Sequence, residues 1–88
     1  PNPAYRPDDH AWIHRPVLIF GPSGPSDDPR VQTQADRFAQ QAAACDEREI
    51  VVFVNPPDRE RFDLSDDQFA VLLIGKDTGV KGRWTEVV

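Results

Sequence analysis

The sequence predicts an α/β domain with a mixed four-stranded sheet, and three observations support this class. Three short, continuous apolar runs are typical of buried strands. A long amphipathic segment lies between the first two runs, and a segment of alternating polarity follows the third. The expected order is therefore strand, helix, strand and then two further strands (βαβ-ββ), with helix and strands around one core.

The N-terminal part of the chain contains the first strand. Residues 1–9 are proline-rich and polar, and we expect them to form a flexible lead-in to a single domain over residues 10–88. The first ordered element is expected near Trp12. The apolar run Val17–Phe20 lies between Pro16 and a Gly-Pro pair, which predicts a short strand that is buried on both faces.

The helix is expected from Pro29 to about Asp46. Asp27 or Asp28 can cap its first amides, and proline suits a first helical turn. Small and apolar residues recur on one stripe of this segment, and we expect the stripe to pack on the sheet. These residues are Val31, Ala35, Phe38, Ala42 and Cys45.

Two further strands are expected at Ile50–Val54 and Phe69–Ile74, with one short helical turn and a loop over residues 58–68 between them. The first of these should run parallel to the strand at Val17–Phe20, because a helix connects the two. Gly75–Gly79 is expected to be a hairpin turn with Gly79 at a positive φ, and Val80–Thr85 an antiparallel edge strand.

The predicted helix covers only one face of a sheet whose first three strands look apolar on both sides. We therefore expect a further helix after Val88 and interpret the chain as incomplete at its C-terminus. The chain begins at Pro1, so we also expect a segment before it. A signal peptide there would make the protein secreted or periplasmic, and its absence would make the protein cytoplasmic.

Composition excludes several classes of protein. The net charge of −5 argues against nucleic acid or an anionic membrane as the main partner. A single cysteine cannot form an internal disulfide, a CxxC pair or a multi-cysteine zinc site. No apolar stretch approaches the roughly 20 residues that span a bilayer. We expect no cofactor, and a protein as the partner.

Several features together resemble one family. They are Trp12 shortly before Arg15, the strand Val17–Phe20, a proline-serine loop, a Gln/Ala-rich helix and above all the stretch Leu72–Lys81. In these features the chain is similar to a bacterial domain-of-unknown-function family of thioredoxin/peroxiredoxin-like proteins. The family also occurs in animal extracellular proteins of the sushi-repeat-containing and coiled-coil-domain-containing groups. The resemblance covers about residues 10–85, and it implies a thioredoxin-like fold with a further C-terminal helix.

Redox catalysis does not follow from this resemblance. Thioredoxin-like enzymes carry a reactive thiol after the first strand, at the start of the first helix, where the helix dipole lowers its pKa. Gly21–Arg30 occupies that place and holds no cysteine, and Asp66-Asp67-Gln68 stands where those enzymes have a proline before the third strand. Cys45 falls on the apolar stripe of the helix, so we interpret it as a core residue rather than a reactive thiol.

The loop Gly21–Asp28 is the best candidate for a ligand site. It follows a parallel strand and precedes a helix, where α/β proteins bind ligands and anions. Ser23 and Ser26 can donate hydrogen bonds, and Arg30 can pair with an anion. A plain helix-capping loop is the alternative, because Asp27 and Asp28 already supply negative charge there.

Three other motifs favour plain structural roles. Gly75–Gly79 lacks the GxxxxGK[ST] spacing of a phosphate-binding loop and should lie at the opposite end of the sheet from Ser23. His10 and His14 have the spacing of a shared metal site on a helix, but the sequence around them favours two surface histidines. The acidic pairs lack the pattern of a calcium-binding loop.

The sequence leads to one preferred function and two alternatives. The preferred function is a non-catalytic interaction or stress-associated domain, with the loop Gly21–Arg30 and the edge near Trp84 as contact surfaces. One alternative is an oxidoreductase that uses Cys45 or a partner's thiol, which rests on analogy of fold alone. The other is an anion-binding module at residues 21–30.

Overall fold

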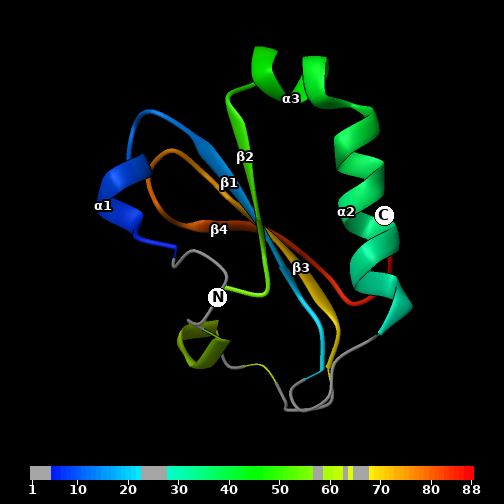
Figure 1. Cartoon of the computed structure of the whole chain (residues 1–88). Coiled ribbons are helices and arrows are strands. Elements are labelled where there is room, and N and C mark those ends of the chain that lie inside the picture. Colours follow the sequence, from blue (N-terminus) through cyan, green and yellow to red (C-terminus); the bar gives the residue numbers. More distant parts are fainter. Residues whose placement is uncertain (1–4, 23–27, 57–58, 63, 65–67) are drawn as a thin grey trace.

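A computed structural model of the chain describes residues 5–22, 28–56, 59–62, 64 and 68–88 (Figure 1). Its strands are β1 (Arg15–Phe20), β2 (Ile50–Val54), β3 (Ala70–Ile74) and β4 (Val80–Trp84). They form one sheet in the order β2-β1-β3-β4. β1 runs parallel to β2, whereas β3 is antiparallel to both β1 and β4. The predicted α/β class with a mixed four-stranded sheet is confirmed.

The helices are shorter than the sequence predicts. They are α1 (Pro7–His10), α2 (Pro29–Gln40) and α3 (Ala42–Glu47), with a 3-10 turn η1 at Arg59–Phe62. The single helix expected from Pro29 to about Asp46 is divided at Gln41, whose backbone leaves the helical region (φ −109°, ψ 28°). Ala42, expected on the packed stripe, is exposed at the start of α3.

Among the described residues, packing against the domain already occurs before the predicted boundary at residue 10. Tyr5 is only 3% exposed, and its ring meets the edge of Phe53 at a centroid distance of 5.7 Å. α1 follows directly at Pro7. Within the part of the predicted lead-in that the structure describes, Tyr5 thus packs against the domain, because its aromatic ring fills a place in the core.

The two faces of the sheet carry separate apolar clusters. The first cluster lies on the side of α1 and η1, and the second on the side of α2 and α3 (Figure 1). Strand alternation sends neighbouring residues to opposite faces, so Leu18 belongs to the first cluster and Val17 and Ile19 to the second. Both faces of β1 are buried, as its continuous apolar run predicts.

Helical cover on the second face is uneven. α2 packs mainly on β1 and β2, and α3 packs on β2. No helix of the described chain has comparable packing on β3 or β4 there. That half of the face is approached instead by the C-terminal residues, which return from β4 to lie beside α2 (Figure 1).

The β3–β4 turn differs from its prediction by one residue. Thr78, not Gly79, has the positive φ (70°). The Gly75 amide donates to the Gly79 carbonyl at 2.8 Å, and the Thr78 amide donates to the Gly75 carbonyl at 3.0 Å. These bonds close a three-residue loop over residues 76–78, whose third position takes the left-handed conformation. The connection between β3 and β4 spans Gly75–Gly79, as predicted, and only the residue with the positive φ differs.

Candidate functional site

Of the three predicted ligand-binding residues, Ser23 and Ser26 lie outside the described residues, and Arg30 can be placed. Arg30 donates to the Asp28 carboxylate twice, from Nε to Oδ1 at 3.0 Å and from Nη2 to Oδ2 at 2.6 Å. Its guanidinium also lies 4.9 Å from the centre of the Phe69 ring. Asp28 accepts the Arg30 backbone amide as the N-cap of α2. Arg30 thus takes part in helix capping in this structure.

Charge at this cap is balanced locally. Hydrogen bonds from the Arg30 side chain, and then from its backbone amide, lower the pKa of Asp28 to about 2. The carboxylate therefore stays ionised throughout the ordinary range of pH. An anion that approached Arg30 would compete with a carboxylate already bound to it at hydrogen-bonding distance.

The two predicted loop regions lie at opposite ends of the sheet. The Gly21 amide donates to Asn55 Oδ1 at 2.8 Å, at the end where β1 and β2 finish. The turn after β3 lies at the other end, where the Trp12 amide donates to the Lys76 carbonyl at 2.6 Å. The antiparallel pairing of β1 and β3 imposes this separation, as the sequence predicts.

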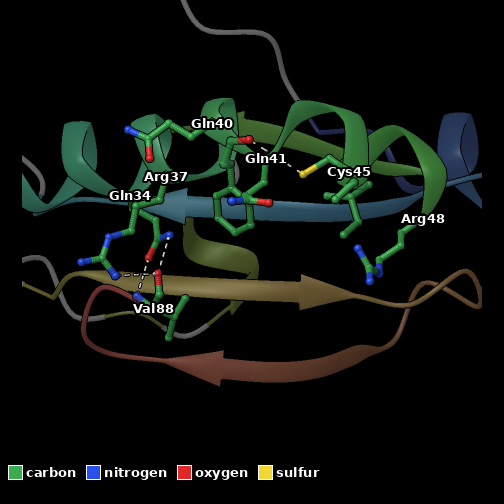
Figure 2. Close-up of a pocket in the computed structure, with 10 residues that line it drawn as sticks. Gln34, Arg37, Gln40, Gln41, Cys45, Arg48 and Val88 are labelled. Carbon is green, nitrogen blue, oxygen red and sulfur yellow. Dashed lines mark hydrogen bonds between the residues drawn. The ribbon is translucent and has the colours of Figure 1, made fainter.

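Cys45 is a buried residue of α3, as predicted. Its side chain is 8% exposed, and its Sγ lies 3.9 Å from the Phe38 carbonyl oxygen, toward which it points in Figure 2. It lies in the second half of its helix, away from the free amides that stabilise a thiolate at a helix N-terminus. The geometry is that of a packing residue.

A groove opens between α2–α3 and the sheet, and we call it the helix–sheet groove (Figure 2). Its wider part has a volume of about 550 Å³, and a wholly apolar extension of about 240 Å³ continues over β3 and β4. The two parts share Phe38, Ile50 and Val88. The other residues of the wider part are Gln34, Arg37, Gln40, Gln41, Ala44, Cys45 and Arg48, and those of the extension are Val17, Val71, Leu73 and Trp84.

The groove combines an apolar floor with basic ends. Trp84 on the edge strand is 40% exposed although its neighbours in the extension are apolar. Arg37 and Arg48 lie at opposite ends of the wider part (Figure 2). No carboxylate side chain is among the described residues that line either part. In a chain of net charge −5, this is a locally basic, apolar surface.

Gln34 fixes the C-terminal residues at one end of this groove. It is 1% exposed, the one buried polar side chain among the described residues. Its Nε2 donates to the Val88 carbonyl at 3.2 Å, and its Oε1 accepts the Val88 amide at 2.8 Å. Arg37 Nη1 adds a bond to the same carbonyl at 3.2 Å. The sequence analysis missed Gln34. Its position four residues before Phe38, on the same face of the helix, was the signal that could have indicated its burial.

The two histidines form a pair on the other side of the sheet. Their Nδ1 atoms are 3.0 Å apart, and the His10 ring also contacts Tyr5 and Phe53. Burial and then the nearby His14 lower the pKa of His10. The two histidines are therefore paired and partly buried, whereas the sequence favoured two surface histidines. α1 and the turn after it bring the two rings together. The sequence of this segment contains no strong helix signal.

The described residues hold neither a multi-ligand metal cluster nor a membrane-spanning helix. They contain no cluster of three or more histidine, cysteine, aspartate or glutamate side chains arranged to hold a metal ion. None of their helices has both the length and the apolar character needed to cross a bilayer.

Comparison with known proteins adds no relative. No family model, no curated protein and no solved structure matches this chain.

Proposed function

We propose that this chain is a non-catalytic interaction domain of the thioredoxin-like class, which binds a protein partner through the helix–sheet groove and the neighbouring edge strand β4. The observation that carries this proposal is the half-covered second face. There Val71, Leu73 and Trp84 line an apolar depression that α2 and α3 leave open. A soluble domain rarely leaves such a surface unused.

The composition of the groove suits a protein contact. Tryptophan and arginine are the residue types most enriched among those that dominate binding energy, and an apolar centre with a polar rim is the usual arrangement. Trp84 supplies the aromatic anchor, and Arg37 and Arg48 supply the rim. We expect the bound segment to present apolar side chains flanked by carboxylates.

Thiol chemistry has little support. The sequence has one cysteine, and it is buried near the end of a short helix. The strand order and directions fit a thioredoxin-like layout, whose usual thiol position after β1 lacks a cysteine in this chain. A domain with this layout and no thiol there is expected to bind rather than to catalyse.

Two measurements test the proposal. Photo-crosslinking with benzoylphenylalanine at position 84 should give discrete protein adducts in an extract of the source cells, whereas the exposed α2 position Thr33 should give none. Equal labelling at both positions would contradict a groove-specific contact. Peroxide- and disulfide-reduction assays should show no turnover by the wild type or by Cys45→Ser. Turnover that Cys45→Ser abolishes would establish the oxidoreductase alternative.

A further inference from the structure

The only two histidines of the chain face each other across the turn that follows α1. His10 Nδ1 and His14 Nδ1 lie 3.0 Å apart, and the two ring centres are 5.2 Å apart. We propose that this pair is a binding site for a late first-row divalent metal ion, Zn²⁺, Ni²⁺ or Cu²⁺, with the two Nδ1 atoms as its protein ligands. The site lies on the opposite side of the sheet from the helix–sheet groove and does not depend on the proposed interaction function.

The backbone between the histidines is folded in an unfavourable way that brings them together. The His10 carbonyl accepts the amides of both Ile13 (3.0 Å) and His14 (2.9 Å), which reverses the chain within four residues. Trp12 takes a positive φ of 64° inside this turn, a conformation that large L-residues avoid. Backbone strain of this kind is often found at functional sites, although the turn residue Thr78 shows that it also occurs in plain turns.

The surroundings hold the His10 ring in place before any ion binds. The His10 ring stacks on Tyr5 at 6.0 Å and meets the edge of Phe53 at 5.2 Å. Tyr5 itself is almost fully buried. A ligand whose orientation is fixed by packing loses little freedom when it coordinates an ion, so His10 is preorganised.

The separation of the two nitrogens fits coordination. Two imidazole nitrogens bound at 2.0–2.1 Å to a tetrahedral zinc ion are about 3.3 Å apart. In a square-planar Cu²⁺ or Ni²⁺ site with similar bond lengths they are about 2.9 Å apart. The value of 3.0 Å in the structure lies between the two, so small ring rotations suffice. Imidazole is a preferred ligand of these three ions.

Protonation is compatible with this site. Two neutral rings with facing Nδ1 atoms share one proton, since one Nδ1 donates and the other accepts. To bind an ion, the donating ring releases its Nδ1 proton to solvent and takes one up at Nε2. Both rings are then Nε2–H tautomers, and no net proton is lost. Asp9, exposed in α1 next to His10, adds negative charge beside the site.

The protein supplies two ligands from the part of the chain that the structure describes, since no third candidate side chain completes a cluster there. Water, or a donor from another molecule, takes the remaining coordination positions. We therefore expect an exchangeable ion with a dissociation constant in the micromolar range, in contrast to the closed four-ligand sites that hold structural zinc.

The test is calorimetric titration of tag-free protein with ZnCl₂, NiCl₂ and CuCl₂. We expect one ion per chain, and at least tenfold weaker binding by His14→Asn and by His10→Phe, which keeps the aromatic packing. Cys45→Ser is the matched control and should bind as the wild type does. Long-range ¹⁵N–¹H spectra of the imidazoles should show both rings as Nε2–H tautomers after the ion is added.

Two results would overturn the proposal. The first is wild-type affinity no greater than that of the His10→Phe/His14→Asn double variant. The second is binding that leaves both Nδ1 resonances unchanged. If His10→Phe fails to fold, His14→Asn with the tautomer measurement decides alone, because the described ring contacts with Tyr5 and Phe53 are made by His10.

Discussion

Gln34 binds the backbone of Val88, 54 positions further along the chain, through both atoms of its side-chain amide. The two bonds join the middle of α2 to the residues that follow β4, and so they place these residues beside the apolar extension of the helix–sheet groove. Val88 remains 47% exposed, so its backbone groups can turn to water if the Gln34 amide is lost.

Gln34→Leu should release the C-terminal residues without unfolding the domain. The stability cost should stay below about 1 kcal/mol, because an apolar side chain suits the buried position and the freed Val88 groups reach solvent. Hydrogen exchange of the Val88 amide should become at least tenfold faster. Gln32→Leu is the matched control, since Gln32 is exposed on the same helix and bonds only to Asp36 among the contacts described for it. Unchanged protection of Val88 in Gln34→Leu would show that other contacts hold the C-terminal residues.

The elements that the sequence predicted well are those set by local pattern. Continuous apolar runs gave β1, β2 and β3, and the proline-containing start gave the N-terminus of α2. The residues it missed depend on distant partners. Tyr5 is buried only because Phe53 and the first face of the sheet receive it, and Gln34 only because Val88 returns to it. The pattern within one segment can indicate a buried face, as the spacing of Gln34 and Phe38 does, but it does not show the distant partner.

The candidate sites follow the same division. Burial of Cys45 could be predicted from its place on the helix stripe. The pairing of Arg30 with Asp28 could not, because a sequence shows a charge near a loop and not the direction of its side chain. The groove could not be predicted either, because it depends on which half of the sheet α2 covers. The close approach of the two histidine rings depends on the positive φ of Trp12, which the sequence does not indicate.

Tyr5→Ala should destabilise the domain by about 3 kcal/mol, as expected for an aromatic side chain removed from a core. This result would show that the N-terminal segment belongs to the domain. Trp12→Ala provides the contrast, because that ring is 75% exposed and its loss should change the free energy of unfolding by about 0.5 kcal/mol or less. Chemical denaturation of both variants measures the difference. Equal losses of stability in Tyr5→Ala and Trp12→Ala would show that residues 5–9 are a lead-in and not part of the domain core.

Thr78→Gly should stabilise the domain by about 1 kcal/mol, because a β-branched residue at φ 70° occupies a conformation that costs roughly 1–2 kcal/mol and that glycine adopts freely. The same substitution at Thr33, an exposed position of α2, should instead destabilise by a few tenths of a kcal/mol through lower helix propensity. Opposite signs in thermal denaturation would establish that the turn is strained at residue 78. A loss of stability in Thr78→Gly would contradict this assignment.

Gly21 is required by close packing at the end of β1. A Cβ atom at this position would lie 2.6 Å from Cγ2 of Val31, closer than real contacts allow. Gly21→Ala should therefore destabilise by about 1–3 kcal/mol, the usual range for overpacking. Val31→Ala removes the clashing methyl group, so the double variant should be more stable than the sum of the two single effects predicts. Simple additivity in denaturant titrations would show that another contact limits the position.

Arg30→Gln should raise the pKa of Asp28 from about 2 toward its ordinary value of 3.8, because the guanidinium is the largest cause of the lowered value. The rise should be incomplete, since the backbone amide of residue 30 continues to donate to the carboxylate. A lowered carboxyl pKa stabilises the folded state above the ordinary pKa, and this contribution is lost as the pH falls from about 4 through about 2. The wild type should therefore lose stability in that window, and Arg30→Gln should lose less.

Carboxyl ¹³C shifts followed during acid titration report the pKa of Asp28. Arg37→Gln, on the same helix, is the control that should leave the pKa of Asp28 unchanged. A midpoint for Asp28 that is the same in wild type and Arg30→Gln would show that the cap amide alone sets its ionisation.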